Sequence, residues 1–136
     1  MNATDTRWAV LDLETRCHVP LARQVLGLGD DVPVAEVQRR LVERRRGEGG
    51  GEFLKLPFHV PVAGAVLLAE AREDLVVPTR WSCWKEGDAP LEDYVARFFS
   101  ELAGRVYVGF NSAGFDLPLM ELWASRCRVG APEHFG

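Results

Sequence analysis

The 136-residue chain has few cysteines, few lysines and no long apolar run. Its three cysteines, Cys17, Cys83 and Cys127, are far apart and form no Cys-x-x-Cys pair, which argues against a structural zinc site and a disulfide framework. The longest apolar stretch, 60–69, is half the length of a membrane span, which needs ~20 residues. No basic segment followed by an apolar one opens the sequence. We therefore expect no membrane association and no secretory signal, and a reducing, cytoplasmic setting.

The composition favours one folded domain. Hydrophobic residues make up 47% of the chain, which excludes wholesale disorder, and 136 residues are too few for two ordinary domains. The net charge of −4 argues against a histone-like coat of positive charge, although an acidic total is compatible with a local nucleic-acid site. We expect one domain over 1–136, with a flexible glycine-rich loop at 47–52.

Hydrophobic periodicity and turn residues predict alternating strands and helices. The expected elements are a buried strand at 7–13, a short helix or turn at 20–28, a helix at 33–46, a hairpin of strands at 60–70 and 76–84, a helix at 90–103, a strand at 106–110 and a last helix at 116–128. This order predicts an α/β fold built on a mixed sheet with flanking helices.

Two carboxylates, Asp12 and Glu14, follow the first apolar run. Residues two apart on a strand point to the same face, so we expect both side chains to project together from the carboxyl end of that strand. Two adjacent carboxylates repel unless a cation lies between them, and oxygen donors suit Mg²⁺ or Mn²⁺. A solvated strand end without any metal explains the same pair, because Asp-x-Glu is common in an acidic chain.

A second polar segment lies between the strand at 106–110 and the last helix. It contains Asn111, Gly114 and Asp116. Asp116 stands two residues before Pro118, which is typical of a helix N-cap. Ligands also gather beyond the carboxyl ends of parallel strands, so Asp116 is equally a candidate to join Asp12 in one cleft. Three carboxylates brought together there need a divalent cation.

These two segments resemble known motifs. The sequence Val-Leu-Asp-Leu-Glu-Thr at 10–15 resembles the first motif of the DEDD 3′–5′ exonucleases, the proofreading-exonuclease superfamily with a ribonuclease H-like fold. The segment 109–119 resembles their second motif, in the form found in bacterial predicted exonucleases similar to the proofreading domain of family B DNA polymerases. Residues 53–60, ahead of the hairpin, also resemble that group.

The resemblance implies a two-metal nuclease that uses Mg²⁺ or Mn²⁺. In that scheme Asp12 bridges both ions, Glu14 holds one and Asp116 positions the other. Asn111 contacts substrate or orients the site, while Leu13 and Phe115 line the pocket for the terminal nucleotide. The implied substrate is the 3′ end of a single-stranded nucleic acid, DNA rather than RNA.

The chain departs from the superfamily in one respect. The third motif, a Tyr or His ahead of a fourth Asp on a helix, is not found; the tail offers Glu133 and His134 in the wrong order. We therefore expect 1–136 to be the N-terminal portion of a ribonuclease H-like domain, lacking its last strand and helix; the alternatives are that another chain supplies the remainder or that the chain is a degenerate member. Such a site should turn over poorly or be inactive, and the uncovered sheet edge should favour self-association.

Other interpretations remain open. A catalytically inactive ribonuclease H-like module that binds nucleic acid or a protein partner fits the same residues. A phosphatase with Asp12 as nucleophile needs a lysine, and only Lys55 and Lys85 are present. The arginines of 39–46 are either a phosphate contact or a solvated helix face paired with glutamates. His18 and His59 have no spaced partners and favour structural roles.

Overall fold

The computed structural model describes residues 6–130, so Glu133 and His134 lie outside the described residues. The chain divides into two compact units. One takes in the residues up to Glu14 and those from Pro61 onward, and the other comprises Thr15–Val60. Within residues 6–130, no helix combines the length and the apolar character that a membrane crossing requires.

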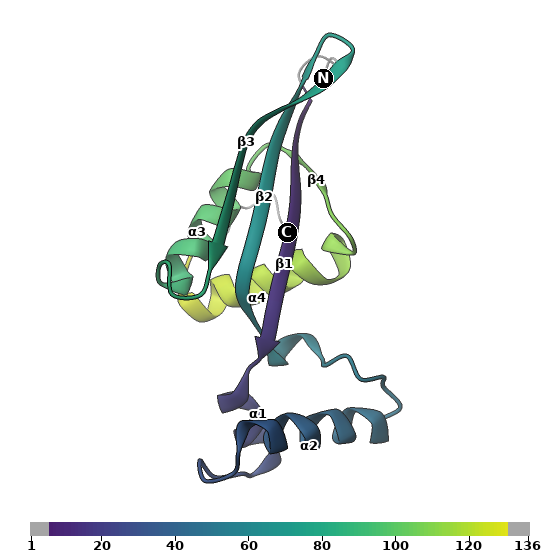
Figure 1. The fold of residues 1–136 in the computed structure, drawn as a ribbon, viewed down its shortest axis with the longest axis vertical. Coiled ribbons are helices and arrows are strands. Elements are labelled where there is room, and N and C mark those ends of the chain that lie inside the picture. The colour runs from purple at the N-terminus through teal and green to yellow at the C-terminus, as the bar shows by residue number, and fades with distance from the viewer. Residues whose placement is uncertain (1–5, 131–136) are drawn as a thin grey trace. The chain divides into compact units, whose positions relative to one another are not determined.

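The first unit is built on a four-stranded sheet (Figure 1). Its strands are β1 (Arg7–Cys17), β2 (His59–Arg72), β3 (Leu75–Lys85) and β4 (Val106–Val108), in the order β3-β2-β1-β4. β2 and β3 are an antiparallel hairpin, whereas β1 and β4 are parallel. The predicted mixed α/β architecture is therefore confirmed, and it is consistent with a ribonuclease H-like fold.

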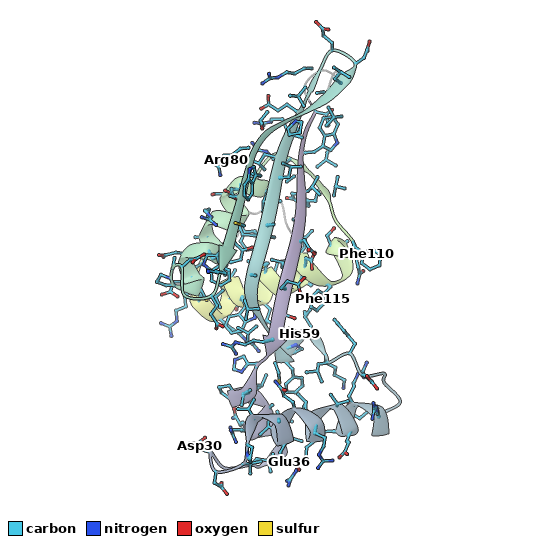
Figure 2. The ribbon with its side chains drawn as sticks, viewed as in Figure 1. Asp30, Glu36, His59, Arg80, Phe110 and Phe115 are labelled. Carbon is cyan, nitrogen blue, oxygen red and sulfur yellow. The ribbon has the colours of Figure 1, made fainter. Side chains whose placement is uncertain are left out.

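Two amphipathic helices cover one face of this sheet. α3 (Leu91–Leu102) and α4 (Leu117–Cys127) both lie behind the strands in the view of Figure 1. Their apolar side chains pack with those of the strands in one core, which includes Leu11, Val66, Trp84, Val95, Phe98, Leu102 and Met120. A polar contact fixes α3 to β3, because the buried Glu101 accepts hydrogen bonds from Arg80 and Ser82. Arg80 is labelled on β3 in Figure 2.

The two predicted strands nearest the candidate site have different bounds in the structure. β1 continues to Cys17 instead of ending at Leu13, so Asp12 and Glu14 lie inside the strand and not at its end. β4 ends at Val108, two residues earlier than predicted. The parallel pairing reaches only Val10 and Val108, and β1 then continues with β2 as its remaining neighbour. The continuation of β1 to Cys17 is not evident from the sequence, because the acidic residues Asp12 and Glu14 interrupt the apolar run.

The second unit, Thr15–Val60, contains α1 (Val19–Leu26), α2 (Val34–Gly47) and the short 3-10 turn η2 (Leu56–Phe58). α1 begins at His18, whose Nδ1 accepts a hydrogen bond of 3.1 Å from the backbone N–H of Leu21. His59 is buried, with Nδ1 at 2.9 Å from Thr15 Oγ1 and Nε2 at 3.0 Å from the Leu54 carbonyl oxygen. Both histidines therefore have structural hydrogen bonds, as the sequence predicts.

Gly64 on β2 lies against the buried ring of Tyr94 on α3. A Cβ at Gly64 would overlap the Tyr94 hydroxyl and lie 2.8 Å from Tyr94 Cζ. Tyr94 cannot easily move away, because it stacks on Trp84 with ring centroids 4.3 Å apart. We expect Gly64→Ala to lower the free energy of unfolding by about 2 kcal/mol, as overpacked cores do. Denaturant unfolding measures the change.

Tyr94→Phe is the matched variant for this prediction. The Tyr94 hydroxyl is buried and has no hydrogen-bond partner among residues 6–130, so its removal alone should be close to neutral. Combined with Gly64→Ala, it removes the nearest clashing atom and should recover much of the lost stability. A double variant no more stable than Gly64→Ala would show that another contact limits this position.

Candidate active site

The side chains of β1 alternate between the core and the opposite face of the sheet. Ala9, Leu11 and Leu13 face the core, whereas the exposed Asp12 and Glu14 project from the other face. The predicted pairing of the two carboxylates on one face is therefore present. Leu13 is 8% exposed and packs in the core on the opposite face, so its position does not support the predicted role in lining a nucleotide pocket.

Asp12 and Glu14 line a groove of about 490 Å³ with the β2–β3 hairpin. The hairpin and the turn after β3 provide the remaining lining residues, which are Ala63, Gly64, Ala65, Cys83, Trp84, Lys85 and Asp88. Asp88 accepts a hydrogen bond of 3.0 Å from the backbone N–H of Lys85, which fixes the turn after the strand. Lys85 brings a positive charge to a groove that otherwise carries carboxylates.

The hairpin residues were not identified from the sequence. Lys85 is 71 positions away from Glu14, and its place depends on the pairing register, in which Ala63 lies opposite Lys85 and Ala65 opposite Cys83. Along the groove, before the irregularity between Leu68 and Ala69, that register puts odd-numbered residues of both strands on the same face as Asp12. Two-residue periodicity indicated the alternation of each strand and the turn residues predicted the hairpin, but neither gave the register of the hairpin or the strand that lies on the other side of β2.

Asp116 lies in a tightly wound turn ahead of α4. The π-helical turn η3 (Ser112–Asp116) runs directly into the helix, and Asp116 has helical backbone angles, φ −62° and ψ −48°. Its side chain is 5% exposed and makes no capping hydrogen bond. Asp116 therefore occupies the predicted N-cap position of α4 but does not cap it through its side chain, because helical winding already begins at Ser112. Single π-helical turns are rare and frequently occur at functional sites.

The loop before this turn is shaped by Asn111 and Gly114. Asn111 has a left-handed backbone, φ 54°, and its carbonyl oxygen accepts hydrogen bonds from the N–H groups of Gly114 (3.1 Å) and Phe115 (2.9 Å). A Cβ at Gly114 would overlap the Asn111 side-chain oxygen, so a larger residue at Gly114 would displace the Asn111 side chain. Phe110 projects into solvent, 98% exposed, whereas Phe115 is partly buried (Figure 2).

Asp12 and Asp116 interact electrostatically. The loop after β4 runs close to β1, since a Cβ at Gly109 would lie 3.0 Å from the carbonyl oxygen of Leu11. Burial, and secondly the negative charge of Asp12, raise the pKa of Asp116 to about 6. A buried carboxylate beside another is unfavourable when ionised, and a cation between them removes that cost.

The three predicted carboxylates do not form one ready-made cluster. Asp12 shares the groove with Glu14 and shares an electrostatic environment with Asp116, but no group of three or more His, Cys, Asp or Glu side chains within residues 6–130 is arranged to hold a metal ion. The donor chemistry nevertheless fits a hard divalent cation, because all three groups offer carboxylate oxygens and the buried Asp116 makes no capping hydrogen bond.

Comparison with known proteins identifies the family. Residues 51–136 match the family described as predicted 3′–5′ exonucleases related to the exonuclease domain of PolB. The matched segment includes the hairpin, the turn η3 and Asp116, and it begins after Asp12 and Glu14. No curated protein and no solved structure is significantly similar to the chain. The match covers more than half of the sequence, and the chain belongs to this family of predicted 3′–5′ exonucleases related to the PolB exonuclease domain.

Proposed function

We propose that the chain is a divalent-metal-dependent 3′–5′ exonuclease domain that hydrolyses terminal phosphodiesters of single-stranded DNA. The observation that carries this proposal is the buried carboxylate of Asp116, whose pKa is raised to about 6 by burial and by the charge of Asp12. Protein sites that keep two carboxylates together at neutral pH commonly do so to bind a cation. Because the chain belongs to a family of predicted exonucleases, we infer that this cation serves phosphodiester hydrolysis.

In this proposal Asp12, Glu14 and Asp116 hold Mg²⁺ or Mn²⁺. Asp12 is the shared ligand, because it lies in the groove with Glu14 and interacts with Asp116. Divalent ions bound there would activate water and neutralise the charge on the leaving 3′ oxygen. Lys85 offers a positive charge to the phosphate of a strand in the groove.

The other site residues have supporting roles in the same proposal. Asn111 shapes the loop that leads into the turn at Asp116, and its exposed side chain can contact the substrate. Phe115, partly buried in that turn, offers an aromatic surface for the terminal base. Leu13 acts from within the core, where its packing fixes the outward direction of its two acidic neighbours.

A strand-shortening experiment tests the proposal. The chain is incubated with a 5′-labelled single-stranded DNA in Mn²⁺, in Mg²⁺ and in EDTA. Because the third motif is not found, we expect slow stepwise shortening from the 3′ end with either ion, loss of shortening in EDTA, and protection when the 3′ end is chemically blocked. Shortening that persists in EDTA, or no shortening with either ion, would overturn the assignment.

A non-catalytic module is the second candidate. It is favoured by one observation: within residues 6–130 the three carboxylates are not arranged as a complete metal site. This candidate predicts that the chain binds the same DNA strand in Mn²⁺ and leaves its length unchanged. Measuring binding by fluorescence anisotropy alongside the shortening assay separates the two functions.

A further inference from the structure

A second pocket lies wholly within the Thr15–Val60 unit. Its volume is about 210 Å³, and its lining combines four apolar and four charged side chains: Val25, Leu41, Leu54 and Phe58 are apolar, and Arg44, Arg45, Glu48 and Lys55 are charged. The charged residues are three cations and one carboxylate, so the lining has a net positive charge. Pockets that enclose drug-sized ligands are roughly 300–1,000 Å³, so this one accommodates only a small fragment, such as one phosphate with part of its neighbouring nucleotide.

Most of the arginines on α2 are neutralised by glutamates. Arg39 and Arg40 pair with Glu36, and Arg39 also pairs with Glu43 (Figure 2 shows Glu36 on this helix). Arg44 pairs with Glu48, and Arg46 with Glu52. These pairs confirm the solvated, glutamate-paired face as the interpretation of most of the arginine run. Within residues 6–130, Arg45 is the arginine of this run that has no carboxylate partner.

The side chain of Arg45 is held in place by a glycine. Its Nε is buried and has no hydrogen-bond partner among the described residues. Gly50 folds back over the end of α2, with its N–H donating to the Arg45 carbonyl oxygen at 3.0 Å. A Cβ at Gly50 would overlap the guanidinium and lie 2.7 Å from Arg45 Cδ, so this packing requires glycine. A buried donor without an acceptor is costly unless a ligand supplies one.

We propose that this pocket binds one phosphodiester group of a single-stranded nucleic acid, with Arg45 as its charged contact. The neighbouring sugar or base would pack against the apolar lining residues, which include Phe58, an aromatic side chain of the kind on which bases stack. Guanidinium is well suited to phosphate, because its donors match the phosphate oxygens. The choice of nucleic acid as the ligand rests on the proposed function; the pocket and its unpaired arginine do not depend on it.

Equilibrium binding tests the inference. Fluorescence anisotropy with a short labelled deoxythymidine strand is measured in EDTA, where hydrolysis cannot contribute, for the full chain and for Arg45→Gln. We expect Arg45→Gln to weaken binding roughly tenfold and to reduce the dependence of log affinity on log salt by about one unit. Arg39→Gln, which removes an exposed and glutamate-paired charge, is the control and should change affinity little.

A glycine pair tests the position of Arg45 without changing the charge. Gly50→Ala displaces the guanidinium and should weaken binding about as much as Arg45→Gln. Gly51→Ala meets nothing within 4 Å and should bind as the unchanged chain does. Thermal unfolding by circular dichroism accompanies each measurement, so that a loss of binding caused by unfolding is recognised.

The outcomes separate this inference from the exonuclease proposal. Arg45-dependent binding by a chain that shortens no DNA would support the pocket and refute the exonuclease. Shortening of DNA with unchanged binding by Arg45→Gln and Gly50→Ala would refute the pocket alone. Thymidine monophosphate serves as a second probe: if it competes fully with the strand at equal phosphate concentration, the pocket is a site for free nucleotides and the inference is overturned.

Discussion

Asp12→Asn is expected to lower the rate of metal-dependent 3′-end hydrolysis by about 10³-fold or more. Asp12 is the carboxylate that is close to both of the others. It lines the same groove as Glu14, and its charge raises the pKa of Asp116. Asparagine keeps the size of the side chain but removes the charge that a divalent ion requires. Losses of this size follow when one preorganised electrostatic contact to the transition state is removed. Initial rates in Mn²⁺ measure the effect.

Two controls make this result specific to the site. Asp74→Asn removes an exposed carboxylate at the turn between β2 and β3, and its rate should equal that of the unchanged chain. The pKa of Asp116 should fall in Asp12→Asn, because one of the two causes of its elevation is gone. Carbon-detected NMR titration of Asp116 reads this directly. Unaltered hydrolysis by Asp12→Asn would remove Asp12 from the catalytic machinery.

Much of the fold follows from sequence periodicity. The alternation of Ala9, Leu11 and Leu13 with Asp12 and Glu14 predicts a strand with one buried face, and the structure confirms it. Helical spacing of apolar residues likewise predicts α3 and α4 to within a residue or two. Such periodicities can be predicted from a single segment, because they depend only on which face of its own strand or helix each residue occupies.

The parts of the site that the sequence did not predict depend on contacts between distant segments. Lys85 enters the groove through the register of the hairpin, which residue alternation alone does not specify. Asp116 has the spacing of an N-cap ahead of Pro118, but the left-handed Asn111 begins an extra turn that carries it into the helical segment and buries it. Local capping preferences therefore gave the right position but the wrong role for the side chain, since the packing of the loop against β1 decides its conformation.

The same burial predicts that Asp116→Asn stabilises the metal-free chain at neutral and alkaline pH. The pKa of Asp116 in the folded state is about 6, above its ordinary value of 3.8, so between these values the folded state holds a proton that the unfolded state has released. Stability therefore falls as pH rises through this window, by up to about 3 kcal/mol at full ionisation. Asparagine removes that cost, and the variant should exceed the unchanged chain by up to this amount near about pH 8.

Denaturant unfolding of both chains, in EDTA and across this pH range, measures the difference in stability. The difference should disappear at about pH 4, because the Asp116 carboxyl is then protonated in the folded state. Mn²⁺ should reverse the ranking at neutral pH, because the ion binds only the folded state and only when the carboxylate is present to hold it. A residue whose replacement stabilises the protein while abolishing hydrolysis is kept for function and not for folding. If the two chains instead keep the same difference in stability at every pH, then Asp116 does not titrate in this window and its charge is already balanced without metal.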